Sequence, residues 1–407
     1  MGIELSLGLF LIAFSLICLM SMVSADQQSD GPPAQQPSYA EHLTPYQNPN
    51  PDYHADFPSI ARAEDGSLVV ILRKCGPWAY EANFQRGIST FFDADTELIV
   101  IRSTDGGQSF KPIASNPVFA GLAIDPVIRL LSDGRLMACA IVGEAATRPQ
   151  RPQMKGVLHR HFPRFDTVIT LEGVSVRFSE DNGVTWSKPS MFTPFAPESL
   201  YNLRKPLELA DGTLLVPLAV GYPWRSRFVG LSRSWDMGQS WGDETYVMED
   251  PQGRYRWAAG TDYWMPTLGL QSNGALVCAY VESPKEPPAG FYSRILTSTS
   301  SDAGYTWHPP TPTGLDGGFP NIITLPDDRY LMTFASRYGS VGALEAAFSS
   351  DGHNWETRLT LRSEEGYEFY YPDSVQLPGG DIFTVYMASP PSRVRTVGAV
   401  RWRLPEQ

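Results

Sequence analysis

The sequence predicts an all-β fold of six similar sheets around an axis, because two short motifs recur in phase along the chain. The first motif is a strand, an Asp-Gly-type turn and a second strand, as in DPVIRLLSDGRLMACA from Asp125. Glycine adopts the positive φ of such a turn without strain, so the pattern indicates a hairpin. Six copies at intervals of about 50 to 80 residues indicate the radial repetition of a six-bladed β-propeller.

The six hairpins begin near residues 57, 126, 204, 266, 320 and 372. In five of them a proline stands seven residues before the turn, and Arg204 takes that place in the third. After the last hairpin, residues 394–404 predict a further strand of blade 6. We expect the segment before His54 to join this blade, because a propeller is stable only when its ring is closed.

The second motif has the pattern Ser-x-Asp-x-Gly-x-Thr-Trp. Its five copies begin at Ser103, Ser179, Ser234, Ser300 and Ser349. We expect the aspartate to accept hydrogen bonds from turn amides, the glycine to take positive φ, and the aromatic ring to pack between sheets. The copies belong to different blades and cannot converge, so the sequence predicts no metal site and no cofactor.

Composition narrows the possible partners. The 407 residues carry a formal net charge of −12 without any basic block, which argues against nucleic acid and anionic membrane surfaces. Residues 5–23 are apolar or small and precede Val23-Ser24-Ala25, which resembles a signal-peptide cleavage site. Residues 1–25 are therefore predicted to be a signal peptide or, alternatively, an uncleaved N-terminal anchor. Either would place the protein outside the cytoplasm, as a secreted, periplasmic or cell-surface protein.

The domain organisation follows from these segments. Residues 26–52 are polar and proline-rich and predict a linker, and residues 53–407 predict the propeller. Both repeated motifs mark one face of it, so functional residues are expected on the other face, where each first strand begins. Candidates there are His54, Asp56, Arg73, Asp125, Arg204, Asp262, Trp264, Glu282, Arg337, Tyr370 and Tyr371. Aromatic rings, carboxylates and arginines in one place suit sugar rings that carry acid groups.

The second motif is the Asp box, or BNR repeat, and with six hairpins in phase the chain resembles the sialidase superfamily over residues 53–404. The resemblance implies a general acid/base at Asp93, in DADTELIVIRSTDGGQSF, and a tyrosine nucleophile at Tyr371. A neutral phenol suits an anionic anomeric centre, and a carboxylate, here Asp262 or Asp56, would remove its proton.

The departures from the family matter for specificity. Sialidases begin blade 1 with Phe-Arg-Ile-Pro, whose arginine binds the sialic acid carboxylate, whereas this chain has Asp56 there. Glu282 or its neighbours take the place of the second arginine, and Arg337 is shifted from that of the third. Trp264 stands where the family has its catalytic glutamate. These differences predict a glycoside hydrolase for a terminal sugar other than ordinary sialic acid.

Two other functions fit the same residues. A polysaccharide lyase would use an arginine or histidine and a tyrosine base to remove the proton beside a uronate. A non-catalytic carbohydrate-binding propeller would explain the missing arginines. In each case the expected partner is a glycan or polysaccharide.

Overall fold

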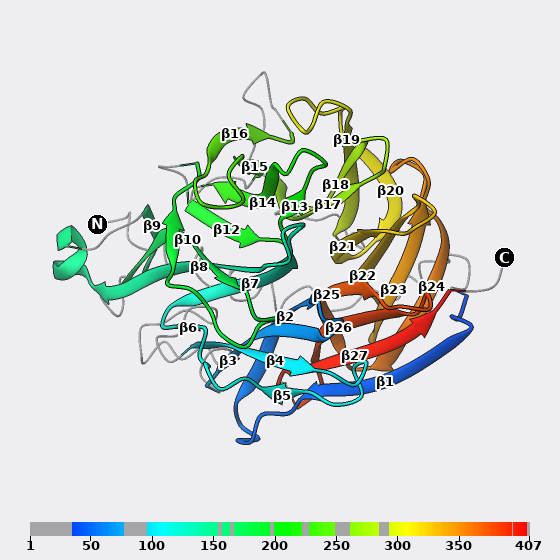
Figure 1. The fold of residues 1–407 in the computed structure, drawn as a ribbon, viewed down its shortest axis with the longest axis horizontal. Helices are drawn as coiled ribbons and strands as arrows, with labels where there is room; N and C mark the ends of the chain where they lie inside the picture. Colours follow the sequence, from blue (N-terminus) through cyan, green and yellow to red (C-terminus); the bar gives the residue numbers. More distant parts are fainter. Residues whose placement is uncertain are drawn as a thin grey trace, which may run out of the picture.

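The computed structural model describes residues 35–76, 96–153, 157–162, 167–195, 199–221, 228–248, 261–284, 293–392 and 394–404. Six antiparallel sheets are arranged around a central axis (Figure 1), which confirms the predicted six-bladed β-propeller. Within the described residues the only helical element is the short 3-10 helix η3 (Arg148–Gln153). None of the described helical segments has the length and apolar character needed to cross a membrane.

The first three blades follow one another along the chain. Blade 1 contains β2 (His54–Arg62), β3 (Leu68–Cys75), β4 (Glu97–Ser103), β5 (Lys111–Pro112) and β6 (Phe119–Ala120). Blade 2 contains β7 (Ala123–Leu130), β8 (Leu136–Thr147), β9 (Val157–Phe162), β10 (Thr167–Ser179) and β11 (Ser190–Phe192). Blade 3 contains β12 (Ser199–Leu203), β13 (Leu207–Glu208), β14 (Leu214–Gly221), β15 (Phe228–Ser234) and β16 (Gly242–Tyr246).

The other three blades have four strands each. Blade 4 contains β17 (Thr261–Leu270), β18 (Leu276–Pro284), β19 (Arg294–Ser300) and β20 (Thr311–Asp316). Blade 5 contains β21 (Gly318–Thr324), β22 (Tyr330–Tyr338), β23 (Val341–Ser349) and β24 (Glu356–Glu365). Blade 6 contains β25 (Glu368–Gln376), β26 (Ile382–Ser389), β27 (Thr396–Arg403) and β1 (Tyr39–Tyr46).

The ring is closed by the two ends of the chain. Strand β1 lies beside β27 (Figure 1), with Tyr39 opposite Arg403 and Leu43 opposite Ala399. The expected closure by the segment before His54 is therefore found. Residues 39–46 consequently belong to the propeller, which corrects the linker boundary at residue 52. The extra strand covers the outer edge of β27, which would otherwise present unpaired backbone groups.

In five blades the innermost strand has a register shift at the repeated proline, and in blade 3 the shift lies between Leu200 and Asn202. The residue before each proline has positive φ: Phe57, Asp125, Met265, Phe319 and Tyr371, at 48° to 56°. A β-bulge suits proline, because a bulge leaves one residue out of the hydrogen-bond ladder and proline has no N–H to contribute. Blade 3 lacks the proline, and its inner strand is divided into β12 and β13.

Apolar side chains fill the spaces between neighbouring blades. Strand β14 is buried along its whole length, and its Val216 and Leu218 belong to the same core cluster as Ile141 and Val174 of blade 2. Each blade is covered on both faces by its neighbours. This arrangement explains why so many strands are apolar without alternation.

The second motif forms turns on five different sheets, as predicted. In the copy on blade 2, Asp181 accepts hydrogen bonds from the amide of Thr185 at 2.8 Å and its hydroxyl at 2.6 Å. In the copy on blade 1, hydrogen bonds from Ser103 and Ser109 hold the pKa of Asp105 well below its ordinary value. These aspartates stabilise their own turns and share no ligand site.

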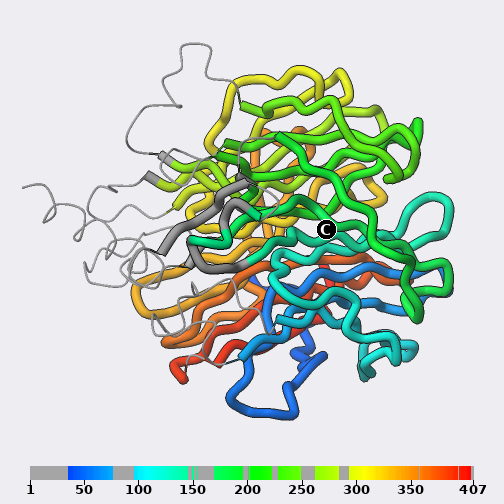
Figure 2. Tube along the Cα trace, turned by 90° about the vertical axis from the view of Figure 1, so that its left-hand side faces the viewer, coloured from blue at the N-terminus to red at the C-terminus, as the bar shows by residue number. Residues whose placement is uncertain are grey.

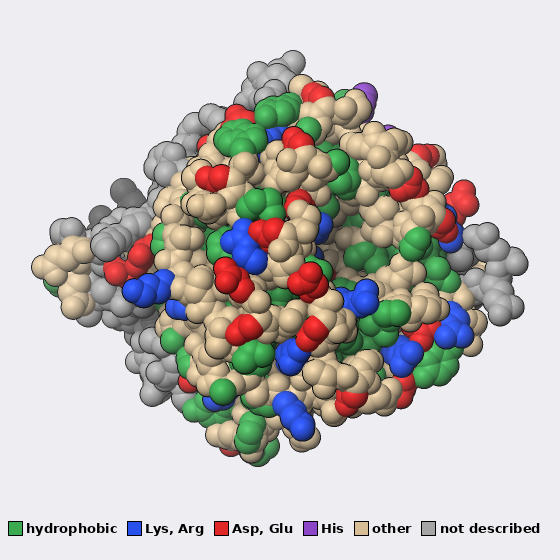
Figure 3. Space-filling model, viewed as in Figure 1, with side chains coloured by type: hydrophobic (Ala, Val, Ile, Leu, Met, Phe, Trp, Pro, Cys, Tyr) green, Lys and Arg blue, Asp and Glu red, His purple; other side chains and the backbone are tan. Residues whose placement is uncertain are grey.

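The strands run between two faces of the molecule, as Figure 2 shows from the side. We call the face at which the innermost strands begin the upper face, and the face with the Asp-Gly-type turns the lower face. Figure 3 shows the lower face, hollowed near its centre.

Candidate active site

The upper end of the axis has an aromatic floor. It consists of Phe57, Met265, Phe319 and Tyr371, the positive-φ residues before four of the repeated prolines. The ring of Tyr371 lies 4.6 Å from that of Phe57 and 4.9 Å from that of Phe319, measured between centroids. Their left-handed backbone conformation brings these side chains together, so the floor depends on the bulges.

Arg204 reaches across the axis and contacts this floor. It comes from blade 3, yet its guanidinium carbon lies 5.4 Å from the centroid of the Tyr371 ring on blade 6. Its Nη2 also donates a long hydrogen bond of 3.5 Å to the carbonyl oxygen of Pro320 on blade 5. Arg204 replaces the proline of the other blades, so the one departure from the repeat places a cation at the centre of the ring.

A tyrosine, a glutamate and an arginine form the first polar cluster beside the floor. The Tyr370 hydroxyl donates a hydrogen bond to Oε2 of Glu368, two residues earlier on β25. Nη1 of Arg337, at the end of β22, donates to the other oxygen of Glu368 at 2.7 Å. Tyr370 is partly exposed, and the guanidinium carbon of Arg395 lies 5.9 Å from its ring centroid.

A second cluster of the same composition lies on blade 4. The Tyr263 hydroxyl donates to Oε1 of Glu282 at 3.2 Å, and Arg294 forms an ion pair with the same carboxylate. Next to it, Nε1 of Trp264 donates to Ser283 at 2.9 Å, while the Trp264 ring packs against Phe319 of the floor. Glu282 is therefore held by a tyrosine and an arginine.

Asp125 is a titratable group near the axis whose acidity is altered by burial. It is buried, and it accepts hydrogen bonds from the Asn202 amide at 3.2 Å and the Leu203 N–H at 3.4 Å. Burial raises the pKa of Asp125 to about 6, although the Asn202 hydrogen bond and the charge of Arg204 act against the rise. A carboxyl group with this pKa holds its proton near neutral pH more often than an ordinary aspartate does.

Asp56 and Arg73 form a buried ion pair inside the wall of blade 1. Nε of Arg73 donates to Oδ1 of Asp56 at 2.7 Å and Nη2 donates to Oδ2 at 2.8 Å, with both side chains 0% exposed. The guanidinium carbon also lies 4.3 Å from the ring centroid of Phe57. The pair supports the floor from the side. Asp56 therefore does not fit the predicted role of a catalytic carboxylate, nor Arg73 that of a substrate ligand.

The remaining predicted residues lie in different settings. His54 is buried, and its Nδ1 accepts a hydrogen bond of 3.0 Å from the backbone N–H of Arg395, which helps to close the ring. Asp262 is buried at the start of β17, opposite Ser283 in the ladder. Tyr371, the predicted nucleophile, is only 7% exposed because it forms part of the floor. Asp93 lies outside the described residues.

Four further residues belong to the site. Glu368 and Tyr263, which the sequence also places at the starts of first strands, complete the two tyrosine–glutamate pairs, while Phe57 and Phe319, which were not predicted as site residues, form the floor. One feature of the sequence points to the pair of Tyr370 and Glu368. Glu368 and Tyr370 are two residues apart on a strand, a spacing that places side chains on the same face.

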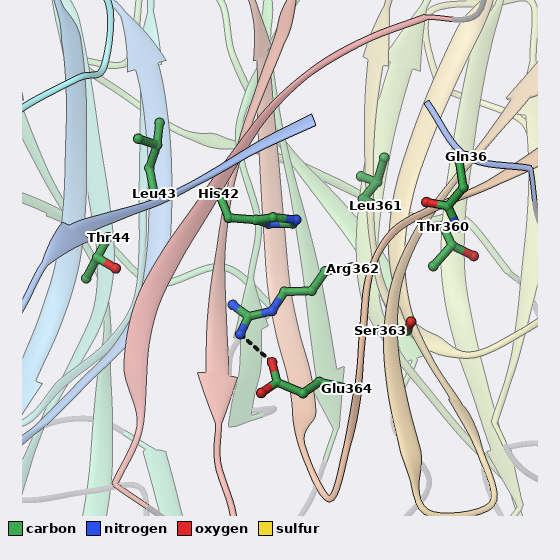
Figure 4. A pocket seen from close by; sticks show the side chains of 9 residues that line it. All are labelled: Gln36, His42, Leu43, Thr44, Thr360, Leu361, Arg362, Ser363 and Glu364. Atoms are coloured by element: carbon green, nitrogen blue, oxygen red, sulfur yellow. Dashed lines mark hydrogen bonds and ion pairs between the residues drawn. The ribbon is translucent and has the colours of Figure 1, made fainter. Parts of the chain in front are cut away.

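A polar groove of about 550 Å³ lies away from the axis, between β1 and β24 (Figure 4). His42 and Arg362 point toward each other across it, and burial together with the charge of Arg362 lowers the pKa of His42. Arg362 is bound to Glu364 and to the Tyr386 hydroxyl, so its charge is used within the fold. In the described part of the chain, no cluster of His, Cys, Asp and Glu could hold a metal ion.

The profile of the BNR repeat-like domain family matches residues 126–384, which is more than half of the chain. The protein therefore belongs to the BNR repeat-like domain family, and its predicted resemblance to the sialidase superfamily is confirmed. No curated protein matches the sequence.

Solved structures share the fold at low sequence identity. A protein of unknown function from Dyadobacter fermentans is 20% identical, with a TM-score of 0.71 over 92% of this chain and 100% of that chain. The alpha-L-arabinanase of Penicillium chrysogenum is 12% identical, with a TM-score of 0.58 over 91% of this chain and 98% of that one. The intramolecular trans-sialidase of Ruminococcus gnavus is 13% identical, with a TM-score of 0.58 over 86% and 94%. These similarities concern the fold.

Proposed function

We propose that the upper end of the axis is the active site of a glycoside hydrolase acting on a terminal, acidic sugar of a glycan or polysaccharide. The observation that carries the proposal is the partly exposed Tyr370, whose hydroxyl is bonded to Glu368 beside aromatic rings and arginines. Aromatic rings with a few convergent polar groups are typical of sites that bind small organic ligands. The sialidase-like fold of the protein and the glycosidases among its structural neighbours agree with this chemistry.

The Tyr370–Glu368 pair supplies a nucleophile and its base. Glu368 accepts the phenolic proton, and the phenolate oxygen of Tyr370 attacks the anomeric carbon while the bond to the leaving oxygen breaks. An acid protonates that oxygen. Water then attacks the anomeric carbon of the glycosyl-tyrosine, and one of its protons passes to the carboxylate that the acid has become. The bond to the Tyr370 oxygen breaks, and Glu368 returns the phenolic proton to it. The proposal moves the nucleophile from Tyr371 to its neighbour, because Tyr371 belongs to the buried floor.

Two carboxyl groups are candidates for the acid. Asp93 is the one that the family resemblance implies. Asp125 has a pKa of about 6, which suits proton donation near neutral pH. Variants of each residue would distinguish them. Loss of the true acid should slow the hydrolysis of substrates with poor leaving groups much more than that of substrates with good leaving groups.

The arginines favour an acidic sugar. Arg395 lies over the ring of Tyr370 and Arg204 lies over the ring of its neighbour Tyr371, so two cations are close to the proposed nucleophile. A guanidinium binds a carboxylate through paired hydrogen bonds. The proposal does not extend to ordinary sialic acid. Asp56 takes the place of the first family arginine, and the nearby Arg73 is already paired with Asp56.

A specific observation favours a second function, non-catalytic carbohydrate binding. In both tyrosine–glutamate pairs the carboxylate already forms an ion pair with an arginine, Arg337 or Arg294. The arginine occupies the carboxylate oxygen that the tyrosine does not, so both oxygens are already bonded within the fold. A binding protein would retain the rings and the arginines without any need for a strong base.

The test is a screen of the purified protein on acidic and neutral glycosides and polysaccharides, with mass detection of released sugars. Release of a monosaccharide that is lost in Tyr370→Phe supports the hydrolase. The matched control is Tyr338→Phe, because Tyr338 donates to Glu345 at 3.0 Å beside Arg358, between the strands of blade 5. Binding of a glycan without any product would support the second function, and an unsaturated product would indicate a lyase.

We also propose that the protein is exported, with residues 1–25 as its signal peptide. The support is the apolar segment 5–23 followed by small residues. The intact mass of the protein recovered from its native host would test this. A mature chain that starts at Asp26 supports cleavage, whereas the full mass in the membrane fraction would indicate an anchor.

A further inference from the structure

The lower end of the axis contains a channel, lined by both polar and apolar side chains, that the proposed activity does not use. Its volume is about 390 Å³, and the ends of the innermost strands of all six blades line it. It opens at the hollow in the lower face (Figure 3). The residues that line it occupy equivalent positions of the repeat, so they form successive rings around the axis.

The ring nearest the floor is neutral and fully bonded. It contains the residue after the repeated proline in each blade, and Asp373 of blade 6 is its centre. This carboxylate accepts hydrogen bonds from the Ser59 hydroxyl at 2.6 Å, the Asn321 amide at 3.1 Å and the Lys205 ammonium at 2.7 Å. Lys205, from the opposite blade, also donates to the carbonyl oxygen of Ile60 at 2.7 Å. One cation and one anion therefore balance each other.

The next ring carries a single charge, that of Arg129. The equivalent positions, two residues further along each strand, are Ala61, Leu207, Gly269, Ile323 and Val375. Nη1 of Arg129 donates to the carbonyl oxygen of Pro206 at 3.0 Å, but its Nε is buried and has no hydrogen-bond partner. Within the described residues Arg129 forms no ion pair.

The nearest carboxylates do not neutralise this guanidinium. Glu208 is engaged by the N–H of Ser132 at 2.9 Å and by its hydroxyl, and Asp373 is paired with Lys205. Burial lowers the pKa of Arg129, and the charges of Glu208 and Asp373 offset only part of that effect. Arg129 is partly exposed and, within the described residues, its guanidinium donates only to the carbonyl oxygen of Pro206, so it has donors left for an anion in the channel.

We propose that the channel binds a small inorganic oxyanion, sulfate or phosphate, between the guanidinium of Arg129 and the ammonium of Lys205. An oxyanion fits because a guanidinium and an ammonium both line the channel, and each is a charge-assisted hydrogen-bond donor. The two cations also repel each other, since the charge of Arg129 lowers the pKa of Lys205. The bound ion would link blade 2 to blade 3 at the axis.

The experiment is calorimetric titration of the purified full-length protein with sodium sulfate and sodium phosphate, against sodium chloride at matched ionic strength. We expect saturable binding of sulfate or phosphate that weakens at least tenfold in Arg129→Gln. The control is Arg135→Gln, because Arg135 already pairs with Asp133 at 2.7 Å on a turn of the lower face. Equal affinity in wild type and Arg129→Gln, or no saturable binding in wild type, would overturn the proposal.

A second measurement keeps the proposal testable if Arg129→Gln does not fold. Wild-type crystals grown or soaked with selenate should give an anomalous selenium peak in the channel, within hydrogen-bond distance of the Arg129 guanidinium. A channel that contains only water under these conditions would contradict the inference.

Discussion

The two ends of the propeller axis use the same six strands but arrange their polar groups differently. At the lower end, Asp373 is buried and receives hydrogen bonds from three side chains of three other blades. At the upper end, Tyr370 and Glu368 are partly exposed. A carboxylate whose acceptor sites are filled by the fold stabilises the fold. A hydroxyl–carboxylate pair that solvent can reach remains able to react with a ligand.

The aromatic floor keeps the two environments apart. Phe57, Phe319 and Tyr371 pack across the axis between the Tyr370 cluster above and the Asp373 network below. Blade 3 contributes a cation both to the floor and to the network below it, since Arg204 lies against the Tyr371 ring and Lys205 is paired with Asp373. The comparison shows that a single irregular blade can place charged side chains both at the aromatic floor and in the network below it.

The largest expected effect is on the lower network. Asp373→Ala should lower the free energy of unfolding by about 3 to 5 kcal/mol, because it leaves Lys205 without its carboxylate and removes an acceptor from Asn321. Denaturant unfolding measures the change. The control is Asp327→Ala, whose exposed pair with Arg329 should contribute about 1 kcal/mol or less. Similar small effects in both variants would remove the distinction between the two ends.

The second prediction concerns the upper cluster. On a confirmed substrate, Tyr370→Phe should lower kcat at least about a hundredfold while the melting temperature stays nearly unchanged. Tyr371→Phe keeps the packing of the floor and should have a smaller effect. If Tyr371→Phe is the inactive variant instead, the nucleophile is the residue implied by the family resemblance. Asp93→Asn is also expected to lower turnover at least about a hundredfold if Asp93 is the acid.

The third prediction follows from the pKa of Asp125, which is about 6 in the folded protein and lower in the unfolded chain. The folded state then binds the proton more tightly, so wild-type stability should fall as pH rises from about 4 to 6 and level off above. Asp125→Asn should remove this dependence, which amounts to about 3 kcal/mol. Unfolding of both proteins at several pH values would show it. A constant difference between them at every pH would contradict the raised pKa.

The smallest effect is expected at the turns of the second motif, far from both ends of the axis. Asp181→Ala removes the acceptor of the Thr185 hydrogen bonds and should lower stability by about 1 kcal/mol without any change in turnover. The adjacent, exposed Glu180 provides the control, and Glu180→Ala should change stability by about 0.5 kcal/mol or less. A loss of turnover in Asp181→Ala would show that this turn affects the site.

The sequence by itself determined the architecture, because both motifs report what the local backbone requires. An Asp-Gly-type turn needs positive φ, and an aspartate beside turn amides needs donors, wherever they occur in the chain. Their count and phase were therefore sufficient for six blades, for the ring closure near His54 and for the structural role of Asp105 and Asp181.

Only the tertiary structure decided which residues face each other at the axis. Asp56 resembled a catalytic carboxylate until its opposite position in the ladder proved to be Arg73, and the exposed tyrosine proved to be Tyr370 and not Tyr371. Arg204 meets the Tyr371 ring 167 positions away in the sequence numbering, across the full width of the ring. Such contacts depend on strand register, bulges and burial summed over six blades, and no local motif encodes them.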